Sequence, residues 1–155
     1  QNSSKRAMPS LGQSEFLKNR KKMVKVTVLK LPSEVKYIKK ASSKILEAVK
    51  PYNLDEGKLY DIRLSVEEAV RNAMVHGNSN DANLSVKVKY WIKDEKLNVE
   101  VEDEGAGYDH GSLPDPTEDD NIMKGSGRGV YLIRRLMDEV KFNEAGNSIK
   151  MVKHL

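Results

Sequence analysis

The sequence contains no cysteine, which excludes disulfide bonds and thiolate metal sites and leaves a zinc site dependent on three scattered histidines. No apolar run approaches the roughly 20 residues of a membrane span, and no signal-peptide core precedes the fold. Aromatic residues make up only 6% of the chain, so few large rings are available for a ligand-stacking surface. We therefore expect a cytoplasmic protein without a membrane segment.

Positive charge is concentrated at the N-terminus. Residues 1–24 contain six basic side chains and one acidic side chain, whereas the whole chain has a net charge of +4. Residues 25–155 therefore sum to about −1. Nucleic-acid binding needs a basic face with interleaved aromatic residues, so we expect no direct contact with nucleic acid.

The composition, 38% hydrophobic and 32% charged residues, is typical of one soluble globular domain. Residues 1–22 are polar, basic and without periodicity, which predicts a flexible N-terminal extension. We assign residues 23–155 to a single folded domain. Residues 108–124 within it are acidic and contain two prolines, and a connection of this length is typical of a lid over a site.

Hydrophobic periodicity predicts the order of the elements. The expected elements are a strand at 24–31, a helix from Ser33 to Val49, a long helix that opens at Asp55 or Asp61 and stops at Gly77, strands at 84–92 and 97–102 joined by a tight turn, a helix at 128–137, and strands at 139–143 and 149–155. Hairpin-paired strands with helices grouped between them indicate an α+β fold. We expect a two-layer sandwich, with a mixed, mostly antiparallel sheet and helices on one face.

The same patterns predict which side chains face the core. The inward candidates are Val24, Val26 and Val28 in the first strand, Val35, Ile38, Ala41, Ile45, Leu46 and Val49 in the first helix, Val86, Val88 and Tyr90 or Trp91 in the next strand, and Leu97, Val99 and Val101 in the strand after it. Ser33 is expected to cap the first helix.

Three polar side chains follow one stripe of the long helix. Glu68, Asn72 and His76 are spaced i, i+4 and i+8, which places them on the same face. Hard oxygen ligands of this kind suit magnesium, and a spare carboxylate can accept a proton. A solvated helix face gives the same pattern, and His76 is better explained as part of the helix end.

A glycine-containing segment directly follows the strand at 97–102. Asp103 is succeeded by Gly105 and Gly107, and two glycines one residue apart let the backbone approach a flat ligand. The carboxylate of Asp103 can accept a hydrogen bond from an exocyclic amine such as that of adenine. A plain glycine-rich turn is the alternative.

A second glycine cluster leads into the helix at 128–137. Gly125, Gly127 and Gly129 precede a helix N-terminus, where unpaired backbone N–H groups and the helix dipole favour an anion. The cluster is neither a Walker A motif nor a dinucleotide fingerprint. Lys124 and Arg128 add positive charge for phosphates, although Arg128 is equally well explained as a solvent-facing residue.

The three motifs, in this order and at this spacing, resemble the ATP-binding boxes of the gyrase, heat-shock chaperone, histidine kinase and MutL superfamily. More narrowly, EAVRNAMVHG, VEDEGAGYD and GSGRGVYLIRRLMDEV resemble the motifs of bacterial anti-sigma-factor serine/threonine kinases. The resemblance covers about residues 24–155 and includes the LPDPTE sequence of the lid.

The resemblance implies a role for each matching position. Glu68 would be the general base, Asn72 would ligate magnesium that bridges the ATP phosphates, and Asp103 would contact the adenine amine. Gly105 and Gly107 would line the base pocket, while Gly125, Gly127 and Gly129 would wrap the phosphates. Ser148 replaces the threonine that the family often has, so a hydroxyl is retained. Glu67 should point about 100° away from Glu68 around the helix and lie on the surface.

The resemblance also implies an activity, cofactors and partners. The chain would bind ATP or ADP with Mg²⁺, phosphorylate a serine or threonine of an anti-anti-sigma (STAS-type) protein, sequester a sigma factor, and act as a homodimer. Two alternatives remain. One is a nucleotide-dependent binding switch with little kinase activity, although such a protein would not need Glu68. The other is a detached histidine-kinase catalytic domain, for which residues 1–22 offer no phosphoacceptor hairpin.

Overall fold

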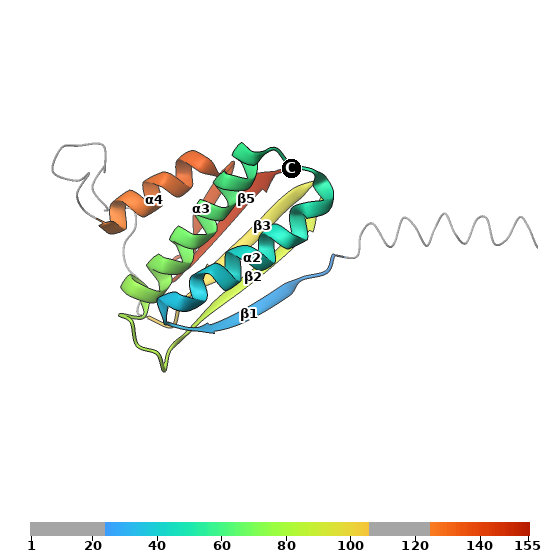
Figure 1. Ribbon diagram of the computed structural model, residues 1–155. Helices are drawn as coiled ribbons and strands as arrows, with labels where there is room; N and C mark the ends of the chain where they lie inside the picture. Colours follow the sequence, from blue (N-terminus) through green and yellow to red (C-terminus); the bar gives the residue numbers. More distant parts are fainter. Residues whose placement is uncertain (1–23, 106–124) are drawn as a thin grey trace, which may run out of the picture.

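The computed structural model describes residues 24–105 and 125–155, which form a sheet covered on one face by helices (Figure 1). The strands are β1 (Thr27–Pro32), β2 (Ser85–Lys93), β3 (Lys96–Glu102), β4 (Glu139–Phe142) and β5 (Ser148–His154). They are arranged in the order β1-β2-β3-β5-β4, and each neighbouring pair is antiparallel. The predicted α+β two-layer fold is confirmed, and the described sheet is antiparallel throughout rather than mixed.

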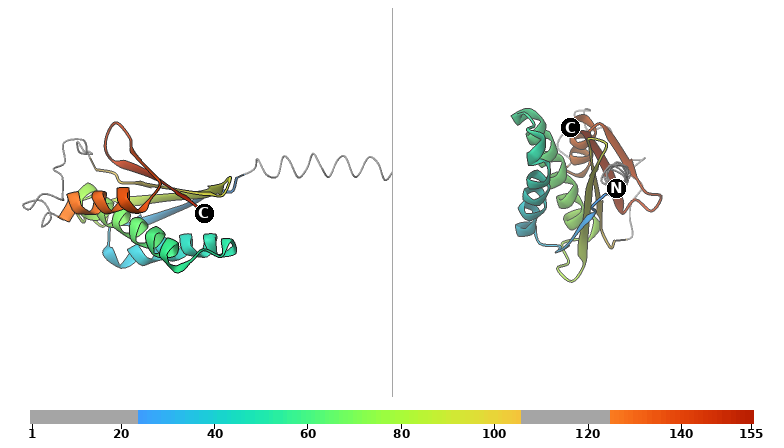
Figure 2. Two further views of the ribbon diagram at one scale, coloured as in Figure 1. Left: turned by 90° about the horizontal axis from the view of Figure 1, so that it is seen from above. Right: turned by 90° about the vertical axis from the view of Figure 1, so that its right-hand side faces the viewer.

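Three α-helices form the second layer. They are α2 (Ile38–Val49), α3 (Glu56–Asn72) and α4 (Gly125–Leu136), with short 3-10 turns at Val35–Tyr37 and Lys50–Tyr52 and a π turn at Ala73–Gly77 that extends α3. All three lie on the same side of the sheet (Figure 2), and α3 contacts both of its neighbours. No helix in the described ranges is long and apolar enough to cross a membrane.

The long helix α3 begins at the first of its two candidate caps. Asn53 has a left-handed backbone with φ of 51°, which ends the preceding turn. The side chain of Asp55 then accepts a hydrogen bond from the backbone N–H of Lys58 at 2.7 Å. This contact satisfies one of the unpaired donors of the first helical turn and fixes where α3 starts.

The core lies between the sheet and the helices. Its members include Val86, Val88 and Tyr90 of β2, Leu97, Val99 and Val101 of β3, Ile38, Ala41, Ile45 and Val49 of α2, and Ile62, Val66, Ala69 and Val70 of α3. The period-2 pattern therefore predicted the buried faces of β2 and β3 correctly, and Tyr90 rather than Trp91 faces the core.

The first strand buries the opposite face from the one we predicted. Val26 and Val28 are 48% and 53% exposed, while Leu31 is buried and Leu29 packs against the core. Apolar residues occupy both alternations of this segment, so the pattern alone could not select a face. Pairing with β2 decides it, because Leu29 lies opposite Val88 and Leu31 lies opposite Val86.

Three single-residue predictions on the helical side were wrong. Ser33 does not cap a helix; its hydroxyl donates to the backbone oxygen of Leu84 at 2.8 Å instead, which ties β1 to the start of β2. Val35 lies in the 3-10 turn and is 59% exposed. Glu67 is half-buried rather than on the surface, because the hydroxyl of Ser42 on α2 donates to its Oε2 at 2.7 Å.

A buried asparagine joins four segments just below the end of α3. Asn78 is 1% exposed, and its Nδ2 donates to Ser33 Oγ at 2.9 Å and to the backbone oxygen of Ser85 at 3.0 Å. Its Oδ1 accepts from the backbone N–H of Glu104 at 2.8 Å. One amide therefore holds the loop after β3 against the ends of α3, β1 and β2.

We expect Asn78→Ala to lower the free energy of unfolding by about 2–4 kcal/mol, because three polar groups, one of them the buried hydroxyl of Ser33, lose a partner. In a domain of this length the midpoint Tm should fall by roughly 5–15 °C in a thermal melt. Asn83→Ala is the matched control, because Asn83 is exposed in the same connection. Equal melting temperatures for the two variants would show that the Asn78 network does not stabilise the fold.

Candidate nucleotide site

Glu68 and Asn72 lie on the face of α3 that α4 approaches. A Cβ atom added at Gly129 of α4 would lie 3.0 Å from Asn72 Nδ2 and 3.1 Å from Glu68 Oε2. These distances are tighter than ordinary van der Waals contact, so glycine is what lets the two helices come together here. Helical spacing correctly placed the two side chains on one stripe, and Gly129 of α4 lies close to both.

Two glycine backbones lie against each other and against Asp103. A Cβ at Gly77 would collide with the Asp103 carboxylate, and a Cβ at Gly105 would collide with the carbonyl oxygen of Gly77. Gly105 was expected to leave room for a flat ligand. In the structure its missing side chain leaves room for the end of α3.

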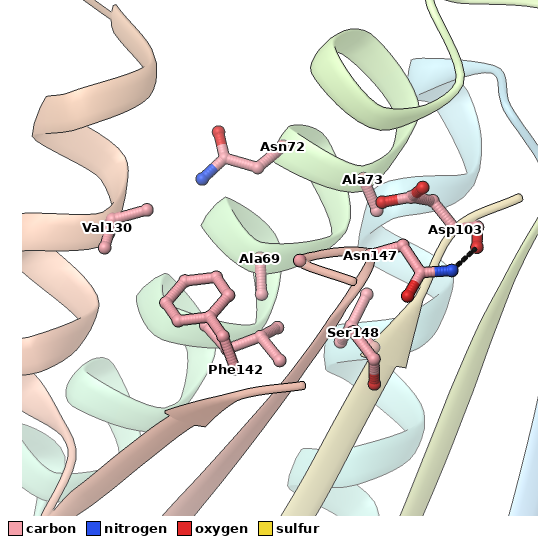
Figure 3. Close-up of a pocket in the computed structure, with 11 residues that line it drawn as sticks. Ala69, Asn72, Ala73, Asp103, Val130, Phe142, Asn147 and Ser148 are labelled. Carbon is pink, nitrogen blue, oxygen red and sulfur yellow. Dashed lines mark hydrogen bonds between the residues drawn. The ribbon is translucent and has the colours of Figure 1, made fainter. Parts of the chain in front are cut away.

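Asp103 is held in a fixed position by its neighbours. Its Oδ1 accepts from the backbone N–H of Gly105 at 2.8 Å. Its own backbone N–H donates to the carbonyl of Asn147 at 2.9 Å, and Asn147 Nδ2 donates back to the carbonyl of Asp103 at 3.3 Å (Figure 3). Asp103 is only 7% exposed, and this burial raises the pKa of its carboxyl group; the Gly105 N–H partly opposes the rise and nearby Glu102 adds to it.

A small cavity of about 20 Å³ lies between α3, α4 and the end of the sheet. Figure 3 shows side chains from all three parts around it, and the residues that line it include Asn72, Asp103, Val130, Phe142, Asn147 and Ser148. A space of this size holds about one water molecule. The cavity itself is therefore too small for a ligand much larger than water.

Polar contacts from β5 and α3 anchor the C-terminal end of α4. Lys153 of β5 is buried, donates to the carbonyl of Leu136 at 2.6 Å and pairs with Asp61 of α3 at 3.3 Å. The contact at Gly129, by contrast, is a close approach of the α4 backbone.

A second cavity, of about 400 Å³, lies on the other side of Asn72. It is lined by Glu68, Arg71, Asn72, Val75, His76, Gly129 and Leu132. Among the residues that the structure describes, Asn72 is the one that lines both spaces. The amide of Asn72 therefore stands between the Asp103 side and the Glu68 side of the site.

The glycine cluster at the start of α4 is helical, whereas we predicted that the helix would begin at about Arg128. The helix begins at Gly125, so Gly125, Gly127 and Gly129 belong to it. Glycine weakens a helix, but the first four N–H groups have no intrahelical partner in any case, which lowers the cost in the first turn. Gly107, Lys124, the side chain of Arg128 and the lid at 108–124 lie outside what the structure describes, as does the extension at 1–22.

Sequence reasoning missed several residues of the site. Asn147 lies between the two strands predicted at 139–143 and 149–155, and no spacing in the sequence indicates that it bonds to Asp103, 44 residues earlier. Arg71 lies one turn from Glu68, and its Nη1 contacts Glu68 Oε1 at 2.8 Å. The i, i+3 spacing of opposite charges was the signal that could have identified this pair.

The described residues contain no cluster of three or more His, Asp or Glu side chains that could hold a metal ion. Asn72 offers a single amide oxygen, with the Glu68 carboxylate one turn away. These donors fit Mg²⁺ that keeps several waters and takes its other ligands from substrate phosphates.

Residues 31–153 match the model of the histidine kinase-like ATPase domain. The chain is 32% identical over 111 residues to the serine-protein kinase RsbW of Bacillus subtilis, which covers 67% of this chain and 68% of that protein. It is 28% identical over 134 residues to the serine-protein kinase RsbW of Listeria monocytogenes, which covers 82% of this chain and 85% of the relative.

The fold also matches a solved structure, that of the RsbU and RsbW domains of Rv1364c from Mycobacterium tuberculosis. The TM-score is 0.57 at 15% sequence identity, and the match covers 83% of this chain and 31% of that longer one. This similarity supports the fold. The family match and the sequence relatives together show that the chain belongs to the histidine kinase-like ATPase family, among the relatives of RsbW.

Proposed function

We propose that this protein is an ATP-dependent serine/threonine protein kinase. The observation that carries the proposal is the convergence of the Glu68 carboxylate and the Asn72 amide on Gly129 of α4, beside the cavity of Asp103. The relatives named serine-protein kinase RsbW support the same reaction class.

The nucleotide would lie between α3, α4 and the sheet end. Asp103 would accept a hydrogen bond from the adenine amine, with Gly105 beside it and Gly107 completing the base pocket. The unpaired N–H groups at the start of α4, from Gly125 onward, would face the phosphates. Ser148 would add a hydroxyl from the start of β5, where it lines the Asp103 cavity.

Asn72 would hold Mg²⁺, which supplies charge neutralisation at the phosphates when it is bound. The remaining positive charge would come from Lys124 and Arg128. Glu68 would orient the acceptor hydroxyl and accept its proton. Phosphoryl transfer of this kind depends on positioning and charge neutralisation, and one carboxylate next to the acceptor is sufficient.

The proposed protein partners are an anti-anti-sigma (STAS-type) substrate and a sigma factor that the kinase sequesters, both in the cytoplasm. We also propose a homodimer. In support of it, β1 is an edge strand of the described sheet, and Val28 in this strand and Val26 just before it are about half exposed. An edge strand with exposed apolar side chains is a ready surface for a second chain.

Glu68→Gln is the direct test of the kinase. It removes the proton acceptor but keeps the shape, so the rate of phosphate transfer from labelled Mg-ATP to the STAS-domain proteins of the same genome should fall by about 100-fold or more. Glu67→Gln is the control, because Glu67 contacts Ser42 on α2 instead of facing α4. Transfer by Glu68→Gln at the wild-type rate would disprove the assignment of the base.

Asp103→Asn should separate nucleotide affinity from stability. The substituted amide presents a donor to the adenine amine, so the Kd for ADP in calorimetry should rise by about 10-fold or more, which is about 1.4 kcal/mol. Unchanged ADP affinity would contradict the adenine contact.

The Asp103→Asn substitution that weakens ADP binding should also make the folded protein more stable at neutral pH. Because burial raises the pKa of Asp103 in the folded protein, the folded state binds the proton more readily than the unfolded chain, and stability is lost as pH rises through that window. At pH 7 the ionised carboxylate is therefore destabilising, and we expect Asp103→Asn to raise Tm. At pH 3, where wild-type Asp103 is protonated in both states, the gain should vanish.

Gly129→Ala tests the approach of α4 to α3. The added methyl group would lie about 3 Å from Asn72 and Glu68, so ATP affinity and phosphate transfer should each fall by about 10-fold. Gly57→Ala in the first turn of α3 is the matched control, since its Cβ would meet only Asp55 Oδ1 at 3.4 Å. Both variants replace a helical glycine, so equal kinetics would mean that the contact at Gly129 is irrelevant to function.

A further inference from the structure

The two oxygens of the Glu68 carboxylate have different surroundings. Oε1 accepts a hydrogen bond from Arg71 Nη1 at 2.8 Å, one turn further along α3. Oε2 is the oxygen that lies near Gly129 of α4, at 3.1 Å from the position of an added Cβ. The guanidinium therefore fixes one oxygen, and the other faces the contact between the two helices.

Both residues also line the cavity of about 400 Å³ on the outer side of Asn72. Of the cavities found around the described residues, this is the one that Glu68 lines, so a hydroxyl that reaches its carboxylate would enter there. The walls on either side are Val75 and Leu132, and His76 lies at the exposed end of the π turn. The acceptor side of the site is thus distinct from the Asp103 side.

Arg71 is 45% exposed at its side chain and Glu68 is 21% exposed. An ion pair this exposed adds little to the stability of a fold. The pair does restrict the orientation of Glu68, because a planar guanidinium that donates to one carboxylate oxygen limits the rotation of that carboxylate. The pair therefore controls the orientation of the Glu68 carboxylate rather than the stability of the fold.

We propose that Arg71 is a positioning residue for phosphate transfer. It holds Oε1 of Glu68 so that Oε2 meets the acceptor hydroxyl, which enters through the outer cavity. The inference rests on the proposed kinase function and deepens it. Arg71 cannot itself be the base, because a guanidinium remains protonated in proteins.

The transfer step balances around this arrangement. The acceptor oxygen forms a bond to the γ-phosphorus while the bond from that phosphorus to the bridging oxygen breaks, and ADP leaves with the bridging oxygen. The proton of the acceptor hydroxyl passes to Oε2 of Glu68. Arg71 keeps its charge and its contact with Oε1 throughout.

The test compares Arg71→Ala, Arg71→Lys and the control Arg63→Ala in steady-state phosphorylation of the STAS-domain protein that the wild-type chain phosphorylates. Arg63 is an exposed arginine of the same helix that lies over the ring of Tyr60 and is not among the residues lining the outer cavity. Each variant is also titrated with ADP in a calorimeter, so that loss of the nucleotide site or of the fold is detected separately.

For Arg71→Ala we expect kcat to fall by about 10-fold, while KM for the acceptor and Kd for ADP stay within about twofold, since misplacing a catalytic group by a fraction of an ångström has costs of this order. Arg71→Lys can still donate to Oε1 and should recover most of kcat. A kcat within about twofold of wild type for Arg71→Ala, or a change confined to the acceptor KM, would overturn the positioning role.

If the proposed kinase function itself is wrong, the same experiments give a different result. If the wild type transfers no phosphate to any STAS-domain protein, or if Glu68→Gln transfers it at full rate, the kinase assignment is wrong and the role of Arg71 falls with it. If Glu68→Gln is inactive and Arg71→Ala is fully active, the kinase assignment stands and only the role of Arg71 is rejected.

Discussion

The buried amide of Asn78 determines how the two halves of the site meet. Glu68 and Asn72 are carried by α3, whereas Asp103 follows β3, and the two segments are joined where the Oδ1 of Asn78 accepts the N–H of Glu104. Both protons of its Nδ2 are used as well, on Ser33 and Ser85. A buried amide with all of its partners satisfied holds one geometry, because any shift leaves a polar group without a partner.

Helix α4 is held in two different ways, by side-chain contacts at its C-terminal end and by a close backbone contact at Gly129. Lys153 ties the C-terminal end of α4 to the sheet and to α3, while Gly129 allows the helix to touch Asn72 and Glu68 without interlocking. Val130, the next residue of α4, is 6% exposed and lines the Asp103 cavity. The glycine contact and this buried valine together place the same part of α4 against the proposed nucleotide site.

Local patterns were sufficient for most of the fold and for part of the site. Period-2 alternation identified the buried faces of β2 and β3, and helical spacing placed Glu68 and Asn72 on one stripe. The face of β1 could not be predicted, because both of its alternations contain apolar residues and only pairing with β2 decides between them. Long-range polar contacts were also beyond a pattern: Asn78 and Asn147 are turn residues in the sequence and become structural links only when distant segments meet.

The contact between Gly77 and Gly105 limits how this site can diversify. Any substituent at either glycine meets main chain or the Asp103 carboxylate, so neither position can change without displacing Asp103 or the end of α3. Variation is open instead at residues that line the Asp103 cavity and do not hold Asp103 in place, such as Ser148. A library that aims to change nucleotide preference in this chain should keep both glycines and vary Ser148.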